Sequence, residues 1–382
     1  MKAGLLLPRS TTHPLITHNF LDGLNSFLRH HHLHKEITYV SGAIGFGTDT
    51  ALIEKEADRL LIEHQVDLIV IFADYPVVKC LFPILKALNK LLIVVNHAAK
   101  YPPSWQAEPN VIHHSLNNAL NCWLTGKKAA KETTAAAVVS SFYDGGYSIN
   151  HALFQSFLNN DGEIVFNFVG HQYKDQFNTQ PLVSFLKQAP DTNSLLAILS
   201  GELVPELYLQ LKEHLTDRKL KVYASPVLLE ESTLAEQQST QICLAGYTSW
   251  FAELADSQNS VFCERFKTDT LRQPDSFAVL GWDTGLLLHT IFEISVDQPI
   301  NARTITQHHL LQNLHGAKGK MQLHPFTQQY ISPVHYLSDD LEGNVIIEHT
   351  LPLEEVMQAF DELITQEVTG FSSEWLNTYL CS

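Results

Sequence analysis

The sequence predicts an α/β fold of two doubly wound parallel-sheet lobes, joined by a hinge, with a ligand cleft between them. Short apolar runs alternate with segments of helical periodicity, as in parallel strands that are covered on both faces. The alternation breaks near residue 120 and then restarts. Loops at the C-terminal ends of such strands line ligand sites, so two lobes are expected to trap a small molecule. The expected strands are 3–7, 37–41, 67–73 and 91–95 in the first lobe and 135–141, 163–168, 195–200, 220–224 and 242–246 in the second.

The length of 382 residues exceeds one comfortable hydrophobic core, so more than one domain is expected. We expect residues 1–120 and 250–328 to form an N-terminal lobe, and residues 121–249 and 329–352 a C-terminal lobe. Residues 353–382 are expected to form a helical tail with an acidic amphipathic helix.

Composition excludes several classes of function. The formal net charge of −16 argues against binding nucleic acid or an anionic membrane through the general surface. No apolar run approaches the roughly 20 residues that span a bilayer, so the chain is not expected to span a membrane. The five cysteines form no CxxC pair, and no disulfide framework is expected. No signal peptide precedes the first strand, which leaves a periplasmic and a cytoplasmic location open.

Polar residues follow three expected strands of the first lobe. Ser10 and Thr11 come after the first strand, where their hydroxyl and N–H groups would either hold a carboxylate or cap the next helix. Asp74 and Tyr75 follow the third strand. His97 and Ala98 follow the fourth, so all three pairs are candidate cleft residues.

The second lobe has its own candidates at strand ends. Tyr147 stands at a strand-to-helix junction, where its ring would either contact a ligand or pack on the loop. Glu202 follows a strand and would either bind an ammonium group or remain a solvated loop charge. Pro226 follows the next strand.

Motifs for cofactors and catalysis were sought along the whole chain. The Gly45–Thr48 segment lacks the ending of a phosphate loop and the three glycines of a dinucleotide site, so no cofactor is expected. His30, His31, His32 and His34 lie at the end of the first expected helix and run into a polar loop, whereas metal-binding histidines usually sit in a closed site with a nearby carboxylate, so a solvated helix end is expected and no metal site. No nucleophile elbow or metal triad appears, and we expect no enzyme.

Four segments resemble the type I periplasmic binding proteins, especially the branch that binds branched-chain amino acids and amides. They are the strand, serine loop and Phe-Leu-Asp-Gly helix at 3–23, the helix and strand at 58–73, the Tyr-Asp-Gly-Gly-Tyr-Ser junction at 143–148, and the pair 276–283 and 316–321. The resemblance covers about residues 1–350. It implies ligand contacts from Ser10, Ile16, Asp74, Tyr75, His97 and Ala98 in one lobe, and from Tyr147, Glu202 and Pro226 or Val227 in the other. The family's usual carboxylate near 227 is replaced by apolar residues.

The resemblance implies a non-enzymatic solute-binding protein that closes on a small polar molecule, amino-acid- or amide-like, for an ABC importer. The expected partners are therefore a small-molecule ligand and an ABC transporter permease, in the periplasm. The alternative is a cytoplasmic ligand-sensing regulator of the same fold that acts on a partner protein. Nucleic acid is not expected as a partner in either case.

Overall fold

The computed structural model describes residues 1–99, 105–146, 148–215, 218–234, 242–297, 300–339 and 344–366. It divides into two compact units. Unit 1 contains Met1–Leu116 and Trp250–Pro333, and unit 2 contains Asn117–Ser249 and the described chain from Val334 onward. The chain thus passes between units after residues 116, 249 and 333, whereas the sequence places the first and last of these passages after residues 120 and 328.

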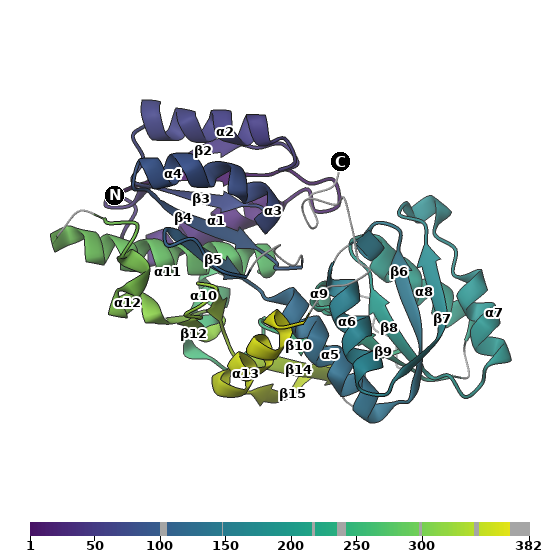
Figure 1. Cartoon of the computed structure of the whole chain (residues 1–382). Helices are drawn as coiled ribbons and strands as arrows, with labels where there is room; N and C mark the ends of the chain where they lie inside the picture. The colour runs from purple at the N-terminus through teal and green to yellow at the C-terminus, as the bar shows by residue number, and fades with distance from the viewer. Residues whose placement is uncertain are drawn as a thin grey trace. The chain divides into compact units, whose positions relative to one another are not determined.

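Unit 1 is built on a five-stranded parallel sheet in the order β2-β1-β3-β4-β5. Because strand order reverses direction at β1, right-handed crossovers place α1 on one face and α2 and α4 on the other (Figure 1). The strands are β1 (Lys2–Leu7), β2 (Thr38–Ala43), β3 (Leu68–Phe72), β4 (Leu91–Asn96) and β5 (Val111–Ser115). The helices are α1 (Ile16–His30), α2 (Thr50–Asp58), α3 (Tyr75–Val78), α4 (Phe82–Ala87), α10 (Ser257–Thr270), α11 (Ser276–Asp297) and α12 (His309–Gln312).

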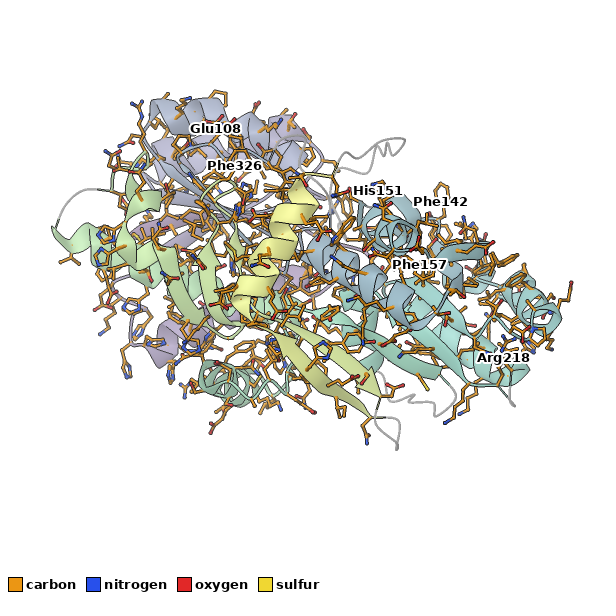
Figure 2. All side chains as sticks on the ribbon, turned by 60° about the horizontal axis from the view of Figure 1, so that its bottom comes forward. Glu108, Phe142, His151, Phe157, Arg218 and Phe326 are labelled. Carbon is orange, nitrogen blue, oxygen red and sulfur yellow. The ribbon has the colours of Figure 1, made fainter. Side chains whose placement is uncertain are left out.

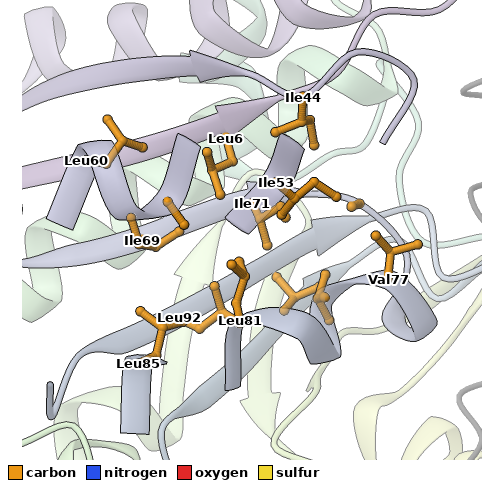
Figure 3. Packing of buried hydrophobic residues seen from close by; sticks show 14 of the residues in the cluster. Leu6, Ile44, Ile53, Leu60, Ile69, Ile71, Val77, Leu81, Leu85 and Leu92 are labelled. Carbon is orange, nitrogen blue, oxygen red and sulfur yellow. The ribbon is translucent and has the colours of Figure 1, made fainter. Parts of the chain in front are cut away.

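The core under α2 and α4 follows the alternation of the strands. Leu6, Ile69, Ile71 and Leu92 of the strands form one cluster with Ile53 of α2, in which Ile71 lies beside Ile53 and Leu92 lies on the α4 side (Figure 3). All five side chains are fully buried. Asp49 begins α2 by accepting the Leu52 N–H at 3.1 Å, as its position in the sequence predicts.

The other face of the sheet depends on a close crossing of α1 and α11. A Cβ atom on Gly23 would lie 2.0 Å from the Ala278 carbonyl oxygen, and one on Gly281 would lie 1.9 Å from the Phe20 carbonyl oxygen. Any side chain at either glycine would therefore force the helices apart. By length and composition, α11 is the one described helix apolar enough to cross a membrane, and 72% of that stretch is buried inside the structure.

A small antiparallel sheet completes unit 1. It contains β11 (Asn313–Gly316), β12 (Gly319–Leu323) and β13 (Tyr330–Ile331). Gly319 has a φ of +81°, which suits the tight turn that the two flanking glycines predict. Lys318 in this turn is buried beside Asp283 of α11 and donates to the Ser115 carbonyl at 2.7 Å.

Unit 2 is built on a seven-stranded sheet in the order β15-β14-β10-β9-β8-β6-β7. Helices α5 and α6 cover one face, and α7 and α8 cover the other (Figure 1). The strands are β6 (Ala135–Ser141), β7 (Glu163–Gly170), β8 (Ser194–Ile198), β9 (Leu220–Ala224), β10 (Ile242–Thr248), β14 (Val334–Asp339) and β15 (Val345–Leu351). The helices are α5 (Asn118–Glu132), α6 (Ser148–Asn159), α7 (Gln180–Gln188), α8 (Leu203–His214), α9 (Pro226–Leu234) and α13 (Leu353–Ile364).

Three features of the fold differ from the sequence-based expectation. Strand β5 was missed because its two histidines interrupt the apolar run, although His114 is fully buried. The sheet of unit 2 is mixed, since β14 pairs antiparallel with β10. Helix α13 is part of unit 2 rather than of a separate tail, because it buries Val356, Phe360 and Leu363 and pairs Glu362 with Lys127 of α5 at 3.0 Å. Residues 367–382 of the expected tail lie outside the described chain.

Candidate functional site

The candidate residues of unit 1 follow strands that end together. The parallel register pairs Leu6 with Ile71 and Phe72 with Val95, so β1, β3 and β4 reach the same edge of the sheet. The loops after these strands carry Ser10 and Thr11, Asp74 and Tyr75, and His97 and Ala98. We call these loops the unit 1 edge.

Ser10 organises the loop after β1 and does not cap α1. Its Oγ accepts the His13 N–H at 2.9 Å, and Ser10 is buried while Thr11 is exposed. Helix α1 begins after Leu15 without a side-chain cap. Of the two readings of this loop, capping of α1 is therefore wrong, and a ligand contact stays a prediction.

The rings of two histidines and two phenylalanines pack against one another at the unit 1 edge. The His97 ring lies 4.9 Å from the Phe277 ring and 6.3 Å from that of Phe72, and the His13 ring lies 5.2 Å from that of Phe277. His97 Nε2 is 3.1 Å from Ser276 Oγ at the start of α11. Burial lowers the pKa of His13 to about 4, and burial and His13 lower the pKa of His97 to about 3. Both imidazoles are therefore neutral at pH 7.

The other unit 1 candidates differ in their surroundings. Asp74 is buried directly after β3. The Tyr75 ring instead packs on the core, 5.5 Å from His113 and 6.1 Å from Phe82. Ala98 has a φ of +50°, a conformation that costs a residue other than glycine about 1 kcal/mol or more and that clusters at functional sites. Ile16 is buried in the first turn of α1.

The corresponding edge of unit 2 is organised by a buried carboxyl group. Asp144 follows β6, and its Oδ2 accepts the Ser141 hydroxyl at 2.6 Å, while its Oδ1 accepts the Ser200 hydroxyl at 2.8 Å from beyond β8. Burial raises the pKa of Asp144 to about 6, although both hydroxyls favour the ionised form. We call the loops after β6, β8 and β9, with the start of α9, the unit 2 edge.

A second carboxyl group reaches the unit 2 edge from α9. Glu231 Oε2 accepts the Gly201 N–H at 2.6 Å. Burial raises the pKa of Glu231 well above its usual value, and the charges of Glu230 and Asp144 raise it further. Two carboxyl groups that resist ionisation in one place suit a cationic group, which would stabilise their charged forms.

The three predicted site residues of unit 2 differ in where the structure places them. Glu202 is exposed just before α8. Pro226 is buried in the first turn of α9 together with Val227. Tyr147 lies outside the described residues. Nearby, Phe142 follows β6 with its side chain 62% exposed (Figure 2).

The family model for the periplasmic binding proteins matches residues 2–335. The chain belongs to this family. The resemblance to type I periplasmic binding proteins is thereby confirmed, and so is the α/β fold with parallel-sheet lobes. No curated protein matches this periplasmic binding protein.

Solved structures share the fold of this periplasmic binding protein at low sequence identity. An ABC transporter substrate-binding protein from Sphaerobacter thermophilus has a TM-score of 0.75 and 17% identity, over 92% of this chain and 98% of that one. A solute binding protein of an ABC transporter from Rhodopseudomonas palustris BisB5, in complex with 3,4-dihydroxy benzoic acid, has a TM-score of 0.71 and 16% identity, over 92% and 97%. A branched-chain amino acid transporter substrate binding protein from Streptococcus pneumoniae, in complex with isoleucine, has a TM-score of 0.66 and 12% identity, over 92% and 98%.

Sequence reasoning missed several residues of the two edges. His13 and Ser276 were not predicted as site residues because both interact with segments far away in the sequence. Ser276 contacts His97, which is 179 residues away, and the His13 ring packs on Phe277. Ser200 ends an expected strand, which was a usable signal. Glu231 follows Val227 by four residues on α9, so helical spacing relates it to the position where the family's carboxylate was sought.

Proposed function

We propose that this chain is a non-enzymatic solute-binding protein that closes on a small polar molecule, amino-acid- or amide-like, for an ABC importer. The observation that carries the proposal is that each unit gathers buried polar side chains at the carboxyl edge of a parallel sheet. In unit 1 they include Ser10, Asp74 and His97, and in unit 2 Asp144, beside which the partly buried Glu231 binds the Gly201 N–H. Ligands of open α/β sheets bind at this edge. The proposed location is the periplasm, as the family name implies.

The chemistry of the two edges supports a ligand with an ammonium or amide group. The unit 2 edge offers two carboxyl groups, and a cation beside them would lower their raised pKa values. The unit 1 edge offers a serine hydroxyl and neutral imidazoles, which form hydrogen bonds with polar uncharged groups or carboxylates. Among the structural neighbours, one is described with isoleucine, which carries both an ammonium and a carboxylate group.

The energy needed for closure is within reach of such contacts. Moving a two-state equilibrium from mostly open to mostly closed takes roughly 5.5 kcal/mol of differential binding. Hydrogen bonds to charged groups contribute about 1.5–3 kcal/mol each. Two to four of them, made only in the closed state, are sufficient.

The lack of enzymatic activity belongs to the same proposal. Ser141 donates to Asp144, but Asp144 also accepts from Ser200, which fixes the carboxyl group as a structural acceptor. A serine nucleophile needs a base that can take its proton and a third group that orients this base. The pair as described supplies a carboxyl acceptor for two hydroxyls, which suits binding rather than turnover.

Native mass spectrometry of freshly purified protein tests the proposal. We expect a bound small molecule of fixed mass that leaves on mild unfolding. The variant Glu202→Gln tests whether the exposed carboxylate takes part in binding. It should lower the affinity for ligands that carry a cationic group and leave the affinity for neutral ligands unchanged. Tyr147→Ala should weaken binding and leave the melting temperature of the empty protein nearly unchanged. Conversion of the released molecule into a product on incubation with fresh protein would refute a purely binding role.

A further inference from the structure

Histidine side chains of unit 1 gather at a place that the proposed function does not use. Helix α1 starts at the unit 1 edge and runs back along the sheet, so its last residues lie at the opposite edge. His30 is the last residue of this helix, His31 follows it, and the later part of α11 brings His289 beside His31. Glu293 follows His289 by one helical turn on α11. We call these four residues the histidine cluster.

Two pairs of rings within the histidine cluster have spacings close to those of two imidazoles on one ion. The ring centres of His30 and His31 are 4.8 Å apart, and those of His31 and His289 are 5.9 Å apart. Two imidazoles on one zinc ion, each with a bond of about 2.0–2.1 Å, have ring centres roughly 5 Å apart in a tetrahedral site. Glu293 Oε1 lies 3.5 Å from His289 Nε2 and supplies a carboxylate.

The cluster is accessible and can adjust. His30 and His31 are exposed, and the side chains of His289 and Glu293 are 27% and 55% exposed. In the rotamers present, no three ligating side chains of the described residues converge on one point. Binding therefore requires the rings to turn, and exposed side chains change rotamer within nanoseconds.

We propose that His31 and His289, completed by His30 and Glu293, bind a first-row divalent transition-metal ion such as Zn²⁺, Ni²⁺ or Cu²⁺. Imidazole is a preferred ligand of these ions, whereas Mg²⁺ and Ca²⁺ prefer sites made of oxygen atoms. His289 and Glu293 are an i, i+4 pair within one helix. The histidines at residues 30–34 offer no such pair, because α1 ends at His30.

A metal requires neutral imidazoles. Imidazole has an ordinary pKa of about 6.5, so it is mostly neutral near pH 7.5, where the binding is tested. Arg29, which precedes His30 in the chain, forms an ion pair with Asp269 at 3.1 Å, which compensates its charge.

The test is titration of the purified full chain with ZnCl₂ by isothermal calorimetry near pH 7.5. The wild type is compared with the double variant His31→Asn/His289→Asn and with the control His34→Asn, which changes an exposed histidine just beyond the cluster. We expect the double variant to lose one site or to bind at that site at least ~10-fold more weakly, since loss of even an outer partner of a metal ligand costs about 10–100-fold. The control should bind as the wild type does, and MgCl₂ should not compete.

A second readout keeps the test independent of calorimetric background. The Trp282 ring lies 5.9 Å from that of His30, so CuCl₂ bound at the cluster should quench tryptophan fluorescence. This quenching should be lost in the double variant, and circular dichroism should show all three proteins equally folded. Equal Zn²⁺ stoichiometry and affinity in the wild type and the double variant would overturn the proposal, as would identical Cu²⁺ quenching.

Discussion

The two units share a doubly wound design, yet they place different chemistry at the same edge of their sheets. The unit 1 edge carries neutral imidazoles among phenyl rings, with His97 between Phe72 and Phe277. The unit 2 edge carries carboxyl groups, with Asp144 held by two serine hydroxyls and Glu231 by a backbone N–H. The strands therefore determine where a site lies, and the loops determine its chemistry.

The contrast predicts that acid weakens unit 1. The folded-state pKa of His97 is about 3, below the ordinary 6.5, so its contribution to stability is fully present above pH 6.5 and is lost as the pH falls below that value. At pH 5 the loss is about 2 kcal/mol for this group alone. Hydrogen exchange of β3 and β4, corrected for intrinsic rates, measures it. His97→Asn should reduce the dependence by about this amount without removing it, because His13, whose pKa burial lowers to about 4, contributes in the same direction. A wild type with equal protection of these strands at pH 7 and pH 5 would contradict this contrast.

Unit 2 should respond to acid in the opposite direction, by a smaller amount. The folded-state pKa of Asp144 is about 6, above the ordinary 3.8, so its contribution is fully present below pH 3.8 and is lost as the pH rises through 6. Lowering the pH from 7 to 5 should stabilise unit 2 by about 1 kcal/mol through this group. Exchange of β6 and β8 reports the gain. Asp144→Asn should remove the part of the gain that comes from this group and leave the part that comes from Glu231, whose pKa is also raised. Glu202→Gln, on the surface, should preserve the whole gain, and the same slope in both variants would assign the effect elsewhere.

The smallest expected effect concerns the coupling of the two carboxyl groups. Asp144→Asn removes a negative charge that raises the pKa of Glu231, so this pKa should fall. Titration of the Glu231 side chain by carbon-13 NMR measures the change, with Glu202 as an internal reference in the same spectra. An unchanged Glu231 titration would mean that burial alone holds its pKa up.

Much of the architecture could be predicted from the sequence. Apolar runs such as 67–73 predicted the strands, and the glycines around the 316–319 turn predicted the hairpin of β11 and β12. Strand β5 could not be recognised, because periodicity does not show that His114 is buried. The mixed character of the unit 2 sheet could also not be predicted from the sequence, because β10 and β14, which pair antiparallel, are almost a hundred residues apart.

For the candidate site, the sequence predicts which strand ends carry the residues better than it predicts what those residues contact. Strand ends marked Ser10, Asp74 and His97 correctly as neighbours along one edge. The Tyr75 ring packs on His113 and Phe82, and its expected contact with a ligand stays a prediction. Contacts between distant segments, such as His97 with Ser276, have no local signal in the sequence. The same holds for the histidine cluster, because His289 approaches His31 only through the crossing of α1 and α11.

The measurement that tests the account most directly is hydrogen exchange of both units with and without the molecule that copurifies. Both edges should gain protection together when this molecule is added back to emptied protein: in unit 1 the loops at residues 8–13 and 96–99, and in unit 2 those at 141–146 and 199–202. Protection confined to one unit, or to surfaces outside both edges, would contradict the proposal that both edges take part in binding the solute.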